Sequence, residues 1–220
     1  MANTLAQRIN RAGGVFVTGT DTGIGKTVTS ACLLRALDGD YWKPVQSGIA
    51  GGTDTEVVAR LSGYAAGRFH ESAYELRAPL SPHEAARRDG VKIEMSAFRR
   101  PKIKRPLVVE GAGGVLVPLN KRSLMIDLIA KLKLPVIVVA QSRLGTINHT
   151  LLTLQALRNG KCTVLGVIMN GPRNAANAAA IEEYGGVPVI AHLAPIKPLN
   201  KKNVETAARK LARAFGTVVS

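Results

Sequence analysis

The segment whose residue types point most clearly to chemistry is Gly19 to Thr27, which reads GTDTGIGKT. A loop that holds a triphosphate needs backbone N–H groups that all point inwards, a conformation that glycine adopts without steric penalty. It also needs a lysine for the outer phosphates and a hydroxyl for Mg²⁺, which Lys26 and Thr27 supply. The segment therefore predicts ATP binding, with phosphate contacts from Gly23, Ile24, Gly25, Lys26, Thr27 and Val28.

The residues on either side of this loop have the patterns of a strand and a helix. Gly14 to Gly19 is a short apolar run, and Lys26 to Leu37 has apolar side chains at helical spacing. A helix that begins at the end of the loop directs its positive end at bound phosphates. The loop is one residue longer than the strict GxxxxGK[ST] pattern, since Thr20 stands where the first glycine belongs. A plain glycine-rich turn is the alternative, and the context argues against it.

Two carboxylates are candidates for binding Mg²⁺, a hard cation that takes oxygen ligands. Glu110 ends an apolar strand and precedes a glycine-rich stretch, so it lies at the carboxyl edge where open parallel sheets bind ligands. Asp54 begins a predicted helix over 54–61 with Thr53 as N-cap, where an acid favoured by the helix dipole is the alternative. We expect a metal site formed by Thr27, Asp54 and Glu110.

Lys43 is a further candidate because it belongs to a second predicted strand, Tyr41 to Gln46, which ends near Ser47. The ends of such strands face the same crevice as the phosphate loop. Lysine is a common surface residue, so the residues alone leave a functional and an ordinary surface role equally open.

The rest of the chain alternates apolar runs with helical patterns. Strands are predicted at 106–109, 135–140 and 163–169, and helices at 124–132, 146–157, 175–184 and 201–215. Ser81 before Pro82 is typical of a helix start with proline at the first position. Alternating strands and helices predict an α/β fold, a P-loop NTPase-like three-layer αβα arrangement around a mostly parallel sheet. We expect residues 1–220 to form one domain, since no linker interrupts the pattern.

The composition indicates a globular protein without a membrane span. The hydrophobic share of 46% is sufficient for a substantial core, and no apolar run is long enough to span a membrane. Two widely separated cysteines predict neither a zinc site nor a disulfide framework, which fits a reducing cytoplasm. The net charge of +15 fits either an anionic partner or a solvated surface. Because no aromatic residues interleave the basic clusters, nucleic-acid binding is not expected.

Four segments, in this order, resemble the dethiobiotin synthetase family. They are the lengthened phosphate loop at Gly19 to Thr27, Lys43 to Gly48 (KPVQSG), Ser81 to Ala86 (SPHEAA) and Glu110 to Gly114 (EGAGG). With the stretch Gly145 to Thr150, the resemblance extends from about residue 14 to 170. It implies an ATP- and Mg²⁺-dependent ring closure in biotin synthesis, in which 7,8-diaminononanoate and CO₂ form a carbamate, ATP phosphorylates it and the second amine closes the ring.

The resemblance also implies roles for individual residues. Lys43 and Lys26 would be catalytic, with Lys43 stabilising the carbamate and transferring phosphate, and Thr22 and Ser47 would contact the substrate. The nucleotide would be contacted by Glu110, Gly111, Ala112, Gly113 and Asn170, in addition to the phosphate loop. A homodimer is implied, with Asn148 near the subunit boundary and the carboxylate end of the substrate.

The chain departs from the family pattern at two places. Gly23-Ile24 stands where many members carry an acidic residue and a valine, and His192 to Pro195 only faintly resembles the base-binding region. Asn170 is the better candidate for reading the base, with a turn asparagine as the alternative. The main competing interpretation is a partition-type ATPase that binds DNA or a membrane, but such proteins carry an extra lysine early in the loop, where this chain has Thr20-Asp21-Thr22.

Overall fold

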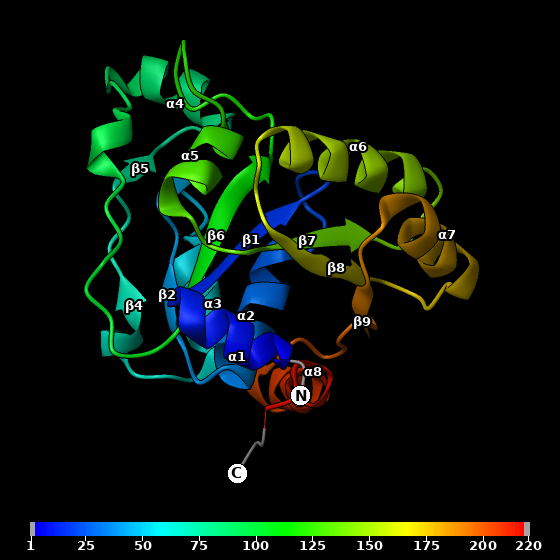
Figure 1. Cartoon of the computed structure of the whole chain (residues 1–220). Helices are drawn as coiled ribbons and strands as arrows, with labels where there is room; N and C mark the ends of the chain where they lie inside the picture. Colours follow the sequence, from blue (N-terminus) through cyan, green and yellow to red (C-terminus); the bar gives the residue numbers. More distant parts are fainter. Residues whose placement is uncertain (1–2, 218–220) are drawn as a thin grey trace.

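The computed structural model describes residues 3–217, and within them seven strands form one sheet in which every neighbouring pair is parallel. The strand order is β4-β2-β6-β1-β7-β8-β9 (Figure 1). Their bounds are β1 Gly14–Gly19, β2 Asp40–Trp42, β4 Phe69–His70, β6 Leu107–Gly114, β7 Val136–Gln141, β8 Val164–Asn170 and β9 Val189–Leu193. A separate parallel pair is formed by β3 (Val45–Ser47) and β5 (Tyr74–Leu76).

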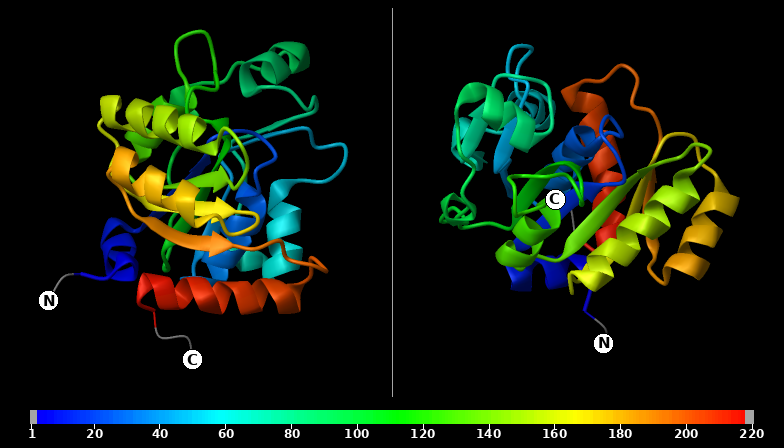
Figure 2. Two further views of the ribbon diagram at one scale, coloured as in Figure 1. Left: turned by 90° about the vertical axis from the view of Figure 1, so that its right-hand side faces the viewer. Right: turned by 90° about the horizontal axis from the view of Figure 1, so that it is seen from above.

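Helices cover both faces of the sheet. On one face, the core includes residues of α1 (Leu5–Ala12), α2 (Lys26–Ala36), α3 (Asp54–Ser62) and α8 (Lys201–Phe215). On the other face, it includes residues of α4 (Pro82–Asp89), α5 (Met125–Leu132), α6 (Thr146–Asn159) and α7 (Ala175–Gly185). Figure 2 shows α8 on the opposite side of the sheet from α6 and α7. Two short 3₁₀ turns, at Ala66–Arg68 and Met95–Ala97, complete the elements.

The side-chain alternation of the strands produces this layering. In β1, Val15 and Val17 pack into the core on the α2 and α8 side, whereas Phe16 packs into the core on the α5 side. In β6, Val108 and Val109 divide in the same way. Successive side chains of a strand point to opposite faces, so one strand supports two half-cores. The expected three-layer α/β fold is confirmed.

Most of the predicted elements are confirmed to within two residues, but one strand is wrong. Tyr41 to Gln46 was expected to be a single strand, whereas β2 ends at Trp42 and β3 begins at Val45 in a different sheet. The break falls at Lys43-Pro44, because proline has no N–H to donate to a ladder and restricts the residue before it. This break separates Lys43 from the ladder.

A second difference concerns Glu110. It was expected to end its strand, but β6 continues to Gly114, so the carboxylate projects from within a strand. The glycines that follow keep extended pairing with β1 as far as Gly19↔Gly114, with an irregularity after Glu110. In addition, α1, β4, β5 and β9 were not expected, although α1 begins at a Thr4 to Gln7 capping box and ends at Gly13. Across residues 3–217, no helix combines the length and the apolar character that a membrane span requires.

Candidate active site

The phosphate loop connects β1 to α2 at the carboxyl edge of the sheet. Gly23 and Gly25 have φ values of 72° and 89°, in the left-handed region that glycine enters most easily. The backbone of α2 begins at Lys26, so its unpaired N–H groups lie at the loop. The Lys26 ammonium lies back over the loop and donates to the carbonyl oxygen of Asp21 at 2.8 Å.

The charge of Lys26 is poorly accommodated without a ligand. Lys26 is only 7% exposed. The pKa of Lys26 is lowered to about 8, chiefly by burial; Glu110 opposes this shift and the neighbouring Lys43 contributes to it. An anion beside this ammonium would relieve the cost of burial, because desolvation penalises an unpaired charge.

Three oxygen-bearing side chains from three elements converge beside the loop. The Thr27 hydroxyl, at the start of α2, is 2.8 Å from Asp54 Oδ1 and 3.0 Å from Glu110 Oε1. Asp54 begins α3, and Glu110 projects from β6. The structure therefore brings together the expected metal set of Thr27, Asp54 and Glu110.

Lys43 lies between these two carboxylates. Its ammonium forms an ion pair with Asp54 and another with Glu110, the latter at 3.0 Å. Burial disfavours the ammonium, but Glu110 and Asp54 together outweigh it, so the pKa of Lys43 is raised. Asp54 responds in the opposite direction: burial raises its pKa, but Lys43 and Thr27 overcome this and the pKa is lowered. The cluster thus holds a positive charge between two carboxylates.

Tyr41 completes the surroundings of Glu110. The phenol is fully buried and donates to Glu110 Oε2 at 3.0 Å. Burial raises the pKa of Tyr41 well above its ordinary value, and the carboxylate raises it further, so the hydroxyl remains a donor. Glu110 is itself fully buried, and its two oxygens are held by Tyr41, Thr27 and Lys43.

The N-terminus of α3 holds Asp54 in position. Thr53 accepts from the Glu56 N–H at 3.1 Å, and the Glu56 carboxylate accepts from the Thr53 N–H at 2.7 Å, which is a reciprocal capping box. The Asp54 N–H donates to Gln46 Oε1 at 3.1 Å. A rigid helix start therefore presents the carboxylate toward Thr27 and Lys43.

A cavity of about 720 Å³ opens beside the cluster. The Ser47 hydroxyl lines it and is buried without a hydrogen-bond partner among the residues described. Buried hydroxyls are normally paired, so this one is free to meet a ligand. Of the expected site residues, the cavity is lined by Thr22, Gly23, Gly25, Lys26, Thr27, Lys43, Ser47, Asp54, Glu110, Ala112 and Gly113.

Other expected residues lie outside this lining. Ile24 and Val28 direct their side chains into the core around α2, and Gly111 contributes its carbonyl to Lys43 at 3.5 Å. Asn170, at the end of β8, donates to the carbonyl oxygens of Ile24 and Gly25 at 2.8 and 3.2 Å. Its amide therefore braces the phosphate loop. Asn148 is exposed in the first turn of α6 and does not line the cavity.

Several residues of the site were not predicted from the sequence. Tyr41 and Gln46 lie near Lys43 in the chain, but Tyr41 contacts Glu110 and Gln46 contacts Asp54, and no local pattern predicts these contacts. Pro79, Leu80 and Val117 form an apolar part of the cavity wall. They had no local signal, because only the fold brings their segments to the phosphate loop.

The donor chemistry of the cluster fits Mg²⁺. Two carboxylates and a hydroxyl are hard oxygen donors. The hydroxyl of Thr27 bonds both carboxylates, and these carboxylates already hold the ammonium of Lys43. Within residues 3–217, no group of three or more His, Cys, Asp or Glu side chains is arranged to hold a metal. A bound Mg²⁺ would thus need oxygens from the nucleotide or water, which is the usual arrangement for this ion.

Comparisons with known proteins agree with this site. Residues 13–203 match the family described as an AAA domain. The chain is 57% identical to the ATP-dependent dethiobiotin synthetase BioD of Paramagnetospirillum magneticum, over 83% of this chain and 88% of the relative. It is 50% identical to BioD of Nitrobacter hamburgensis, over 88% of this chain and 91% of the relative.

A solved structure extends the comparison to the fold. The septum site-determining protein MinD of Pyrococcus horikoshii, complexed with Mg-ADP, superposes with a TM-score of 0.54 at 17% identity, over 91% of each chain. At this identity the likeness shows a shared P-loop fold and nothing about activity. The high identity over nearly full length is decisive instead: the chain belongs to the family of ATP-dependent dethiobiotin synthetases.

Proposed function

We propose that this enzyme forms dethiobiotin from 7,8-diaminononanoate, CO₂ and ATP, and that the reaction takes place in the cavity beside the phosphate loop. The family assignment supports the overall reaction. One observation supports placing the reaction in this cavity: Lys43 is held there between Asp54 and Glu110. Lys26 and the Ser47 hydroxyl, which has no hydrogen-bond partner among the described residues, line the same cavity.

The proposed reaction has three steps. One amine of the substrate attacks CO₂ and loses a proton, which gives a carbamate. A carbamate oxygen attacks the γ-phosphorus of ATP and the bond to ADP breaks, which gives a carbamic-phosphoric anhydride. The second amine then attacks the carbamate carbon and loses a proton, phosphate leaves with the electrons of the C–O bond, and the ureido ring closes. Each step moves negative charge, and phosphoryl transfer depends mainly on positioning and on cations around the moving group.

Lys43 and Lys26 are the proposed cations. Lys43 has a raised pKa and remains an ammonium, so it can stabilise the carbamate and the phosphate oxygens but is unsuited to act as a base. Lys26 would leave the Asp21 carbonyl and pair with the outer phosphates. Lys26 would thus exchange an internal partner for the negative charge of the phosphates.

Mg²⁺ is the proposed cofactor, held by Thr27, Asp54 and Glu110. When bound, it would neutralise charge on the ATP phosphates. The Tyr41 hydroxyl would keep Glu110 oriented, and the capping box of α3 would keep Asp54 oriented. These contacts leave the carboxylates little freedom to rotate away from the cation.

The remaining contacts are proposed from the family resemblance. The nucleotide would meet the phosphate loop backbone at Gly23 to Val28, the turn at Gly111, Ala112 and Gly113, and Asn170 near the base. Thr22, Ser47 and Asn148 would contact the substrate, with Asn148 acting at the boundary of a homodimer. We also propose one domain over residues 1–220 and a cytoplasmic location, which suits an ATP-dependent enzyme with two free cysteines.

A phosphate-release assay tests the function. Purified protein with ATP, Mg²⁺ and bicarbonate should release phosphate only when diaminononanoate is added. Lys43→Ala should lower kcat by on the order of 100-fold or more while nucleotide binding persists, since it removes a cation at the reacting phosphate. Lys26→Ala should lower kcat and also weaken nucleotide binding. Lys104→Ala, at an exposed position, is the matched control.

The competing activity gives a different result in the same assay. Hydrolysis that is equal with and without the diamine, and that DNA stimulates, would mean a partition-type ATPase. A normal rate in Lys43→Ala would remove that residue from the mechanism even if the product formed is dethiobiotin.

A further inference from the structure

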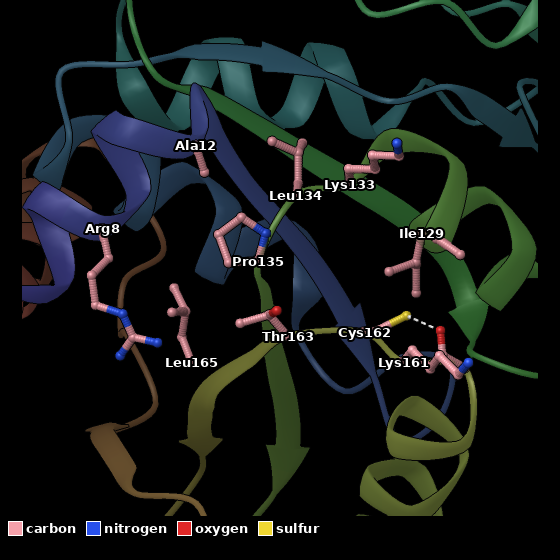
Figure 3. Close-up of a pocket in the computed structure, with 12 residues that line it drawn as sticks. Arg8, Ala12, Ile129, Lys133, Leu134, Pro135, Lys161, Cys162, Thr163 and Leu165 are labelled. Atoms are coloured by element: carbon pink, nitrogen blue, oxygen red, sulfur yellow. Dashed lines mark hydrogen bonds between the residues drawn. The ribbon is translucent and has the colours of Figure 1, made fainter.

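A second cavity, of about 520 Å³, is lined by none of the phosphate-loop residues, and Figure 3 shows its lining. It is formed by α1, by the turn between α5 and β7, and by the turn between α6 and β8. These segments all precede their strands β1, β7 and β8. Because the strands are parallel, their amino ends share the sheet edge opposite the one that carries the active site. A ligand in this cavity would not touch the residues of the proposed reaction.

The rim of this cavity is cationic. Arg8, Lys133 and Lys161 line it, and no aspartate or glutamate does. None of the ion pairs found in residues 3–217 involves these three side chains. Figure 3 shows Arg8 on one side of the opening and the two lysines on the other. Three unneutralised cations around one hollow produce a local potential that favours an anion.

Both lysines occupy backbone positions that normally favour glycine. Lys133 has φ 52° and Lys161 has φ 54°, each in a left-handed turn between a helix and the following strand. Left-handed backbone is unfavourable for residues with a Cβ, and glycine is the usual choice at such turns. Two neighbouring turns thus carry a lysine at a position where glycine would relieve strain, and both border the same cavity.

The floor of the cavity is apolar. Leu134, Pro135 and Leu165 are buried residues that border it, with Ile129 beside them. The Sγ atom of Cys162, which donates to the Gly160 carbonyl at 3.5 Å, belongs to the same lining. A cationic rim over an apolar floor matches a ligand with an anionic head and a hydrocarbon body, and the volume is in the range of small-molecule sites.

We propose that this cavity binds a small amphiphilic carboxylate, which the positive potential of Arg8, Lys133 and Lys161 attracts to the rim while the hydrocarbon chain lies on the floor. The volume accommodates a medium-length hydrocarbon chain, and octanoate serves as the probe. The site is separate from the cavity proposed for dethiobiotin formation, since the two cavities share no lining residue.

Cys162 provides the test, because it is partly exposed in the cavity while the other cysteine, Cys32, is buried and acts as an internal reference. The rate of Cys162 alkylation by iodoacetamide is measured by mass spectrometry of the intact protein. Octanoate should slow it severalfold with saturation. Acetate, inorganic phosphate and 1-octanol at equal concentration should have a clearly smaller effect, because each supplies only one half of the ligand.

Variants locate the effect. R8Q/K133Q/K161Q should lose the octanoate protection, whereas K202Q/K210Q/R213Q removes the same charge from exposed positions of α8 and should retain it. Circular dichroism checks that both variants are folded. Absence of protection, equal protection by acetate, phosphate or 1-octanol, or unchanged protection in R8Q/K133Q/K161Q overturns the proposal. Dethiobiotin formation, measured in the same samples, should be unchanged in both variants, so a failed site is distinguishable from a failed function.

Discussion

At the scale of the residue, Lys43 neutralises two carboxylates that come from β6 and α3. Removing the ammonium in Lys43→Ala leaves Glu110 buried without a cationic partner. We expect the free energy of unfolding to fall by on the order of 3 kcal/mol, as when one partner of a buried ion pair is deleted. Mg²⁺ should restore part of this loss, because it returns positive charge to the same oxygens.

Urea unfolding with and without Mg²⁺ measures the effect, and the exposed Lys202→Ala should show no change in either condition. If Lys43→Ala is as stable as the parent without metal, the ion cluster does not carry the charge balance described here.

Tyr41 offers a second prediction, because its hydroxyl donates to Glu110 inside the core. Tyr41→Phe keeps the ring but leaves Oε2 of the carboxylate without this donor. The expected loss is about 1.5–3 kcal/mol, typical of a hydrogen bond to a charged group. Chemical unfolding of Tyr184→Phe is the control, since that ring is 69% exposed. Equal stability of the two variants would contradict the assigned hydrogen bond.

Lys26 predicts a pH dependence of nucleotide binding. Its pKa is lowered to about 8 in the free protein, chiefly by burial. Phosphates favour the ammonium and raise the pKa, so ATP binding should take up a proton above about pH 8, and affinity should fall as the pH rises. For a pKa returned to its ordinary value, the uptake is about 0.7 proton near pH 8.5. Lys43 stays charged in both states and contributes nothing.

Isothermal titration calorimetry in two buffers of different ionisation enthalpy measures this uptake. Lys26→Gln should show none. Proton release on binding, or the same uptake in Lys26→Gln, contradicts the origin assigned to the effect.

At the scale of the element, the start of α3 determines where Asp54 points. Thr53→Ala removes one half of the capping box and should cost about 1 kcal/mol of stability. Asn174→Ala removes a comparable cap, the bond from the Asn177 N–H at the start of α7, which lies away from the cavity. Both variants should lose similar stability, but only Thr53→Ala should weaken Mg²⁺-ATP binding, as measured by calorimetry. Equal binding in both would mean that the cap has no influence on the site.

The sequence predicted those elements whose signals are local. The phosphate loop, the cap at Thr53 and the proline start of α4 each depend on a few adjacent residues, and all three are confirmed. Lys43-Pro44 illustrates the limit: the proline that ends β2 is visible in the sequence, but the pairing of β3 with β5 in a second sheet depends on residues far along the chain. Tyr41 was missed for the same reason: its partner Glu110 is 69 residues away, and no local pattern reports a contact across the sheet.

At the scale of the whole molecule, β1 and β6 contribute alternate side chains to the two half-cores on opposite faces of the sheet. Loosening either half-core therefore withdraws support from the same strands. Leu211, on α8, and Leu128, on α5, are fully buried in different half-cores. We expect Leu211→Ala and Leu128→Ala each to cost about 2–5 kcal/mol and to shift one common unfolding transition.

The single tryptophan makes this prediction measurable, because Trp42 packs in the half-core that contains Leu128 and not Leu211. In Leu211→Ala, Trp42 fluorescence and far-UV circular dichroism should shift to the same lower urea midpoint, although the deleted side chain lies on the other face of the sheet. The exposed Leu152→Ala should leave both midpoints nearly unchanged. If the Trp42 midpoint stays at the parent value while circular dichroism falls, the half-cores unfold separately and the proposal of one domain over residues 1–220 is wrong.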